Sequence, residues 1–201
     1  MKDSIRMEAA RGAGLAPWLN ALAELRIRVF RDYPYLYDGS PEYEMAYLAP
    51  YLQCEDSLCL LALDGDKVVG ASTGLPLARE VDEFKAPFLA QGLAVEDIFY
   101  CAESVLLPDY RGLGLYRAFF GGREAHANSL GFTRAAFCAV VRPDDHPLKP
   151  AGYRPLTEVW ARFGYHPVVG LSTRFRWKDR DRAEETDKPM QFYLKTLEVQ
   201  P

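Results

Sequence analysis

At 201 residues, with 49% hydrophobic and 26% charged residues, the chain has the composition of a globular protein with one core, and we expect a single domain over residues 1–201. The net charge of -4 argues against nucleic-acid binding as the main function. No stretch approaches the roughly 20 apolar residues of a membrane span, and no basic region precedes an apolar run at the N-terminus. We therefore expect a cytoplasmic protein without membrane contact.

Cysteine and histidine spacing does not indicate a metal site. Four cysteines lie apart, in or near apolar strands, and we expect them to be reduced core residues: Cys54, Cys59, Cys101 and Cys138. No pair of the three histidines has the spacing of a metal motif, so we assign no metal.

Two helices are expected near the N-terminus. An amphipathic helix is predicted from Pro17 to Tyr33 and Pro34, and a second from Ser40 to a break at Pro50. The aromatic residues between and within these helices either line a substrate cleft or pack between the helices and a sheet.

A β-hairpin follows. Apolar strands at residues 57–63 and 67–74 flank the turn at residues 64–66, and Pro76 ends the second strand. Residues 79–93 (Arg79 to Leu93) carry apolar side chains at roughly helical spacing, which predicts a helical insertion that could cap a site.

The next segment is organised as strand, tight turn and helix. An apolar strand begins near Ile98 and ends at Pro108, the turn contains Gly112 and Gly114, and a helix is predicted over residues 115–129. Glycines let a ligand approach the backbone, and backbone N–H groups converge at the positive end of a helix. The turn therefore predicts a phosphate site.

Glu103 is a carboxylate in the middle of this apolar strand. Burying it unpaired would be costly, and partial desolvation would raise its pKa toward neutrality, where it could act as a general base. The alternative is a structural ion pair with an arginine such as Arg134 or Arg142. Its position alone leaves both interpretations open.

The C-terminal third alternates apolar segments with polar connections. The apolar segments predict a strand at residues 132–141, a short helix at 155–163, and strands at 171–178 and 190–197. The loop at residues 144–149 follows a strand end, where open α/β sheets place ligands, and the charged run at 179–188 is expected to be a solvated connection.

Two other glycine-rich motifs fit poorly. The turn lacks the Gly-Lys-Ser/Thr ending of a P-loop and the third glycine of a dinucleotide fingerprint. By contrast, the order of elements and two motifs resemble the GNAT superfamily of acyl-CoA-dependent N-acyltransferases. The first motif is the turn from Arg111 through Gly114, with Tyr116 where glycine or alanine is usual; the second is the helix ending Trp160 to Tyr165.

The resemblance implies a class and a cofactor. It implies an α/β (α+β) fold with a splayed, mostly antiparallel mixed sheet flanked by helices, and acetyl-CoA as cosubstrate. The pantetheine arm would bond the strand backbone around Val105, Leu106 and Leu107. The pyrophosphate would be held by the amides of Arg111, Gly112, Leu113, Gly114, Leu115 and Tyr116. Either the Tyr116 ring crowds this site, or it points away while its amide still donates.

The resemblance also implies a mechanism in which a deprotonated amine attacks the thioester directly and a strand N–H stabilises the oxyanion. We take Glu103 as the base. Trp160 occupies the position of the tyrosine that protonates the leaving thiolate in many members, so Tyr153 and Tyr116 are the candidate acids, and we take Tyr153 as catalytic.

The leading hypothesis is an acetyl-CoA-dependent N-acetyltransferase acting on a primary amine of a small molecule or peptide. The alternative is a non-catalytic acyl-CoA-binding or partner-binding module with the same fold, and acyl-CoA hydrolysis is a third reading. Exposed C-terminal strands can pair across a two-fold axis, which would give a homodimer.

Overall fold

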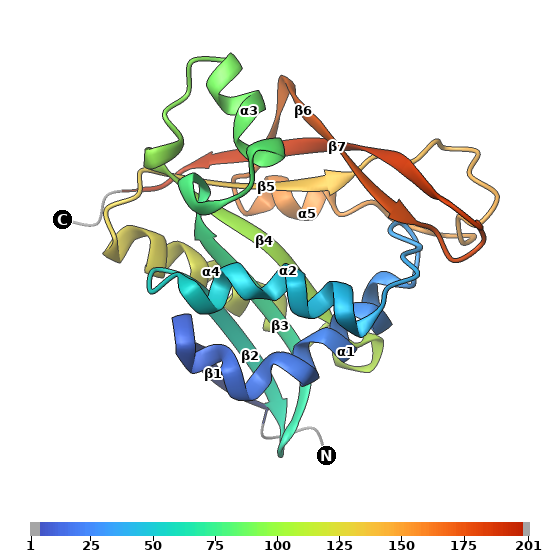
Figure 1. Cartoon of the computed structure of the whole chain (residues 1–201), viewed down its shortest axis with the longest axis horizontal. Helices are drawn as coiled ribbons and strands as arrows, with labels where there is room; N and C mark the ends of the chain where they lie inside the picture. Colours follow the sequence, from blue (N-terminus) through green and yellow to red (C-terminus); the bar gives the residue numbers. More distant parts are fainter. Residues whose placement is uncertain (1–4, 199–201) are drawn as a thin grey trace.

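A seven-stranded sheet in the order β1-β2-β3-β4-β5-β7-β6 runs through the computed structural model, which describes residues 5–198 (Figure 1). The strands are β1 (Ile5–Ala10), β2 (Leu58–Asp64), β3 (Lys67–Pro76), β4 (Ile98–Leu106), β5 (Arg134–Val140), β6 (His166–Lys178) and β7 (Glu185–Thr196). Neighbouring strands are antiparallel except β4 and β5. The predicted fold class, a mostly antiparallel mixed sheet flanked by helices, is confirmed.

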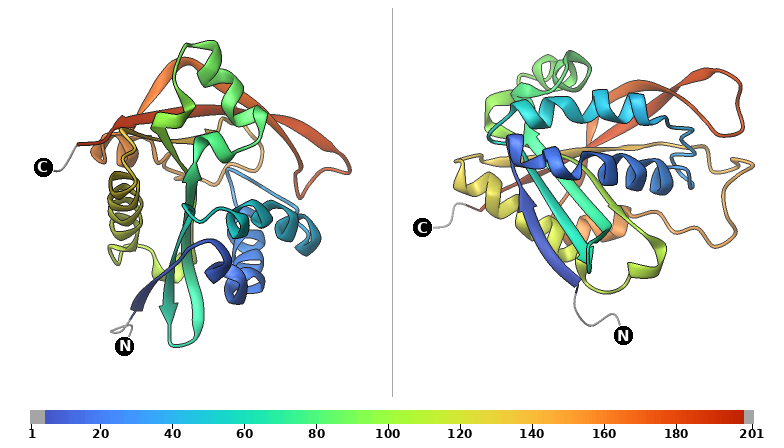
Figure 2. Two further views of the ribbon diagram at one scale, coloured as in Figure 1. Left: turned by 60° about the vertical axis from the view of Figure 1, so that its left-hand side comes forward. Right: turned by 60° about the horizontal axis from the view of Figure 1, so that its bottom comes forward.

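Helices cover both faces of the sheet. They are α1 (Leu19–Phe30), α2 (Pro41–Gln53), α3 (Asp82–Ala90), α4 (Leu115–Ser129) and α5 (Thr157–Arg162). Figure 2 shows α1 and α2 on one face of β2 to β4 and α4 on the other, while α3 packs against β6. Among the helices of residues 5–198, none has the length and apolar character needed to cross a membrane.

The central strand β4 diverges from one of its neighbours. It pairs with β3 from Phe99 to Leu106, but with β5 only over residues 98–100. Beyond Tyr100 the two parallel strands separate, as Figure 1 shows. Because a strand without a neighbour leaves its peptide groups unpaired, this wedge exposes backbone N–H and C=O groups that a ligand could bond.

Most predicted elements are present. The hairpin forms as β2 and β3 and ends at Pro76, the insertion contains α3, and α4 spans the predicted range 115–129. All four cysteines are buried free thiols, as predicted.

Three expectations are corrected. The strand β1, which pairs along β2, was not predicted. The second helix continues through Pro50 to Gln53, because Leu48 and Tyr51 on either side of the proline are buried and their packing outweighs the lost hydrogen bond. The run at 179–188 is not simply a solvated connection: its two end residues, Asp179 and Lys188, are buried, and β7 already begins within it.

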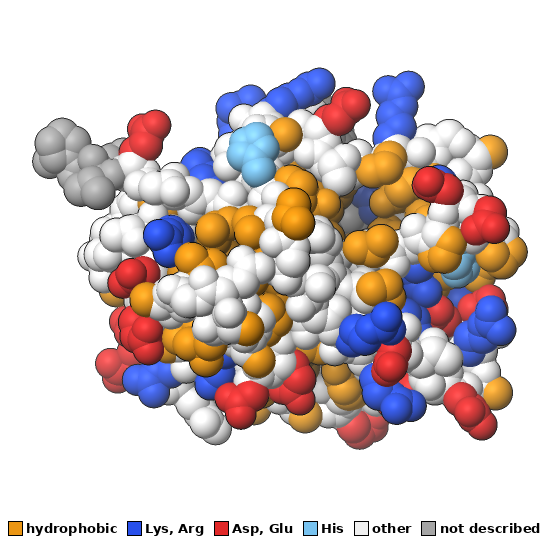
Figure 3. Space-filling model, turned by 90° about the horizontal axis from the view of Figure 1, so that it is seen from above, with side chains coloured by type: hydrophobic (Ala, Val, Ile, Leu, Met, Phe, Trp, Pro, Cys, Tyr) orange, Lys and Arg blue, Asp and Glu red, His pale blue; other side chains and the backbone are white. Residues whose placement is uncertain are grey.

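Charges of both signs are interspersed on the face that carries α3 and the β6–β7 hairpin. Figure 3 shows Lys and Arg next to Asp and Glu there, with hydrophobic side chains between them. The exposed apolar residues on these elements include Leu89 and Val169. This face therefore presents no field of a single sign of the kind that steers nucleic acids.

Candidate active site

The wedge between β4 and β5 places backbone donors of the predicted cofactor segment. Leu107 donates its N–H to Val69 O on β3 at 2.9 Å, so this amide is already used. The N–H and C=O groups of successive residues in a strand point to opposite sides. Val105, like Leu107, therefore directs its N–H and C=O toward β3, whereas Leu106 directs its own toward the open side of β4. Of the three predicted residues, Leu106 is therefore the one whose peptide groups face the wedge.

The glycine turn joins β4 to α4 and leaves helix donors free. Gly112 and Gly114 have φ angles of 78° and 80°, a region that other residues enter only at a steric cost. A Cβ at either position would meet nothing within 4 Å, so the space beside the turn is open. Within residues 5–198 no hydrogen bond takes up the N–H groups of residues 112–116. These amides lie at the N-terminus of a 15-residue helix, where an anion is favoured.

The Tyr116 side chain does not extend over the turn. Its hydroxyl accepts a hydrogen bond from Trp160 Nε1 at 2.8 Å, and its ring packs against Phe120 and Phe163. Of the two orientations considered from the sequence, the ring adopts the one directed toward α5, away from the turn. Arg111 is exposed beside the turn, but its N–H is donated to Pro108 O at 3.1 Å, so of the predicted amides this one is already used.

Two adjoining cavities lie along the wedge. The larger, about 680 Å³, is bounded by α1, α2, α3, β4 and the β6–β7 hairpin, and the smaller, about 90 Å³, lies between β4, β5, α4 and α5. Five residues line both: Phe30, Tyr35, Ala102, Glu103 and Cys138. The larger volume is typical of small-molecule sites. A ligand in the wedge would therefore meet one in the larger cavity at Glu103.

Glu103 is paired at this junction. Arg26 Nη1 lies 2.5 Å from its Oε1, and Tyr47 donates its hydroxyl to Oε2 at 3.1 Å. Arg26 also pairs through Nε with Glu44 and lies 4.0 Å from the centroid of the Tyr47 ring. Glu103 thus forms a structural ion pair, as one of the two interpretations predicted. Its partner is Arg26 on α1, far away in sequence, and not Arg134 or Arg142.

Glu80 is a second carboxylate of the larger cavity, and sequence reasoning missed it. It follows the 3-10 turn Leu77–Arg79 and is half-buried. Burial raises its pKa to about 7, and the charge of Glu103 adds to the effect. Only its place in the predicted capping insertion could have pointed to it.

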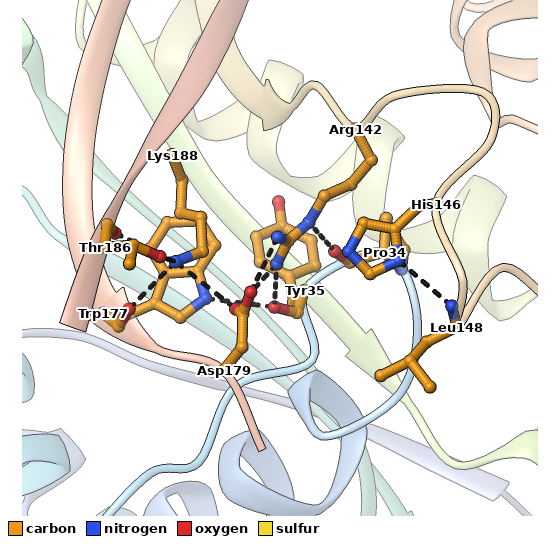
Figure 4. A network of polar contacts seen from close by, with 9 residues as sticks. All are labelled: Pro34, Tyr35, Arg142, His146, Leu148, Trp177, Asp179, Thr186 and Lys188. Carbon is orange, nitrogen blue, oxygen red and sulfur yellow. Dashed lines mark hydrogen bonds and ion pairs between the residues drawn. The ribbon is translucent and has the colours of Figure 1, made fainter. Parts of the chain in front are cut away.

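A buried polar network anchors the segment before α2 to the β6–β7 hairpin (Figure 4). Arg142 forks onto Asp179 through two hydrogen bonds of 2.8 Å, and it donates to Pro34 O and Tyr35 O at 2.7 Å each. Trp177 Nε1 also donates to Tyr35 O, at 3.0 Å. The network fixes the backbone of Tyr35, whose ring lines both cavities.

The structure does not bring Tyr153 to this junction. Its ring packs edge-on against Tyr33 with centroids 4.6 Å apart, and it lines neither of the two cavities. Trp160 does line the smaller cavity, where its indole N–H is taken by Tyr116. The catalytic assignment of Tyr153 stays a prediction.

Comparison with solved structures identifies the fold. An N-acetyltransferase from Staphylococcus aureus superposes with a TM-score of 0.62 at 10% identity, covering 98% of this chain and 100% of that one. The ribosomal-protein-S18-alanine N-acetyltransferase from Escherichia coli gives a TM-score of 0.59 at 11% identity, covering 98% and 97%. A protein from Salmonella typhimurium, solved with its cofactor acetyl-CoA, gives 0.58 at 11% identity, covering 96% and 95%.

The chain thus has the fold of the GNAT superfamily of N-acetyltransferases, as its sequence motifs predicted. No protein-family model matches the sequence, and no curated protein matches it. At these identities the likeness establishes the fold alone.

Proposed function

We propose that the protein is an N-acetyltransferase that transfers the acetyl group of acetyl-CoA directly to a primary amine of a small molecule or peptide. The observation that supports this most is the meeting of two cavities at Glu103, one along the β4–β5 wedge and one large enough for an acceptor. A non-catalytic acyl-CoA-binding module with this fold is the alternative. A cytoplasmic location and a homodimer stay predictions.

Acetyl-CoA fits the wedge and the turn. The free amides of residues 112–116 at the α4 N-terminus would hold the pyrophosphate. The backbone of Leu106 would hydrogen-bond the pantetheine arm, which would lie beside β4 in the place of an additional strand. The thioester would then reach the junction of the cavities, and a backbone N–H of β4 would stabilise the oxyanion.

Direct attack is favoured over an acyl-cysteine intermediate. Cys138 is the thiol at the junction, where it shares a hydrogen bond of 3.1 Å with Tyr100. Burial raises the pKa of this thiol to about 12, so it stays protonated and weakly nucleophilic at neutral pH. The acceptor nitrogen therefore has no competing nucleophile at Cys138.

The larger cavity suits an amine with an apolar body. Aromatic residues are the largest group in its walls, including Tyr37, Tyr43, Phe84 and Trp177, and the carboxylates of Glu80 and Glu103 lie among them. Aromatic faces bind apolar groups and cations, and the carboxylates favour an ammonium group.

The test is thiol release from acetyl-CoA across 2-phenylethylamine, tryptamine, spermidine and a peptide with an N-terminal alanine, with product masses measured. Release that depends on the amine and yields the acetylated product supports the proposal. Tight CoA binding without turnover on any amine would favour the binding module, and release without amine would indicate a hydrolase.

Substitution of Gly114 by alanine is expected to weaken CoA binding roughly tenfold, because an alanine in this left-handed conformation costs about 1–2 kcal/mol and the turn would relax away from its ligand geometry. Calorimetric titration with CoA measures the change. Gly121→Ala is the matched control: it lies in α4, and its Cβ would meet nothing within 4 Å. Equal CoA affinity of the two variants would contradict the assigned role of the turn.

A further inference from the structure

Glu80 and Glu103, two of the four carboxylates that line the larger cavity, have different partners. Glu103 has one oxygen on Arg26 and the other on the Tyr47 hydroxyl, at 2.5 and 3.1 Å, and its side chain is only 6% exposed. Each oxygen therefore already has one donor, and the contact with Arg26 is a buried ion pair. Proton transfer to Glu103 would first require breaking a buried ion pair.

Glu80 lacks such a partner. Within the described part of the chain no ion pair engages its carboxylate, and the contact found is a hydrogen bond from the backbone of its neighbour Val81. The nearby Lys85 pairs instead with Asp82, at 3.1 Å. Glu80 therefore presents a carboxylate without an ion-pair partner to the cavity that Glu103 also lines.

The charged and titratable surroundings of Glu80 come from several elements. The groups that interact with it electrostatically are Tyr47 and Tyr51 on α2, Lys85 on α3, Tyr100 and Glu103 on β4, and Cys138 on β5. The same cavity is also lined by Glu83 on α3, Arg174 and Arg176 on β6, and Asp187 on β7. The tyrosines and the thiol are neutral at pH 7 because burial raises their pKa values.

Glu103 and burial thus act on Glu80 in the same direction. Burial and, to a smaller extent, the charge of Glu103 together raise the pKa of Glu80 to about 7, against the opposing effects of the Val81 N–H and Lys85. The Glu103 carboxylate is held in an ion pair and that of Glu80 is not, so the two can take different roles in one site. A base that titrates near the working pH is also the most effective one.

We propose that Glu80 is the general base of the acetyl transfer and that Glu103 is a positioning residue, an inference that rests on the proposed function. The acceptor enters as an ammonium ion and gives one proton to the Glu80 carboxylate, directly or through one water. The amine nitrogen then bonds to the thioester carbonyl carbon, and the C–S bond breaks as the electron pair leaves with sulfur. The second nitrogen proton passes to the departing thiolate, which leaves as CoA thiol, and Glu80 returns its proton to solvent.

The test is the pH dependence of kcat/KM at saturating acetyl-CoA for the fastest amine of the four-member panel. The wild-type rate should rise with pH through about 7, because only the Glu80 carboxylate accepts the proton. Glu80→Gln should lose this rise and at least about 100-fold in rate at neutral pH, with unchanged CoA affinity. Glu80→Asp, which keeps a carboxylate, should recover part of the rate.

Glu103→Gln distinguishes the role of Glu103 from that of Glu80. Removing the charge of Glu103 lowers the pKa of Glu80, so the rise in rate should move to lower pH but persist. Glu96→Gln, the same change at an exposed residue outside both cavities, is the control and should match the wild type.

The outcomes distinguish this inference from the proposed function. If Glu80→Gln keeps the wild-type rate and its rise with pH, Glu80 is not the base; if Glu103→Gln alone removes the rise, Glu103 holds that role. If the folded wild-type protein binds CoA but acetylates none of the four amines, the proposed function fails, and the assignment of Glu80 fails with it.

Discussion

Arg26→Met should lower the free energy of unfolding by about 3–5 kcal/mol, because it leaves two buried carboxylates without their shared cation. The Arg26 side chain is 6% exposed, and those of Glu44 and Glu103 are 0% and 6% exposed. Both carboxylates are therefore largely shielded from bulk solvent. Urea unfolding at pH 8 measures the change through its midpoint.

The sign of the pH dependence follows from the same contacts. An unpaired buried carboxylate has a raised pKa in the folded state. It therefore lowers the free energy of unfolding more as pH rises, and protonation removes this cost as pH falls. The deficit of Arg26→Met should therefore shrink below neutral pH. Adding Glu44→Gln and Glu103→Gln to the variant should recover much of the loss.

The matched control for Arg26 lies on the surface. Arg31 follows α1 and pairs with Asp38 at 3.1 Å, with their side chains 53% and 31% exposed. An ion pair in water contributes less than about 1 kcal/mol, so Arg31→Met should unfold close to the wild type. If Arg26→Met loses no more stability than Arg31→Met, the buried network does not carry the energy assigned to it.

Local signals predicted the central part of the fold. Proline and glycine positions bounded the hairpin at Pro76 and the turn at Gly112 and Gly114, and helical periodicity gave α4 its full extent. These features depend on residues close together in the chain, and so did the motif that led to the GNAT fold. The geometry of the glycine turn could therefore be predicted from the sequence, while its role in holding a cofactor stays a proposal.

Contacts between distant segments were not readable. β1 becomes a strand because β2 offers it an edge, and α2 passes Pro50 because its flanking residues are buried by other elements. The charged run at 179–188 looked solvated, yet Arg142 from another segment draws Asp179 into the interior. In each case tertiary packing outweighed a local preference.

The acceptor side of the site depends on the same kind of contact. Glu103 was identified as an unusual buried carboxylate, but its partner, Arg26, lies on α1, 77 residues earlier in the chain. The two readings offered for Glu103, base or ion pair, could be compared only once Arg26 and Glu80 were placed beside it. A single sequence does not show which residues so far apart in the chain form an ion pair.

Arg142→Met should lower the free energy of unfolding by about 3 kcal/mol and raise the KM for the acceptor amine. Burial alone would raise the pKa of Asp179, but hydrogen bonds and charge from Arg142, with the charge of Lys188, hold it below its usual value. Without Arg142, the ion pair left to the Asp179 carboxylate among residues 5–198 is that with Lys188, at 3.5 Å, and the carbonyls of Pro34 and Tyr35 each lose a hydrogen bond from Arg142.

The effect on KM follows from Tyr35. Its ring stacks on Trp177 with centroids 6.0 Å apart and forms part of both cavities, so a loosened backbone would disturb the acceptor cavity at its junction with the wedge. Urea unfolding and acceptor kinetics with the panel amines measure the two effects together.

Two variants make the test of Arg142 specific. Arg142→Lys keeps the charge but cannot reproduce the planar fork on Asp179 while donating to two carbonyls, so its stability should fall between wild type and Arg142→Met. Arg182→Met, an exposed position near the start of the same charged run, should leave both stability and KM unchanged. The network would have no role in shaping the acceptor cavity if Arg142→Met lost stability as expected and still kept the wild-type KM.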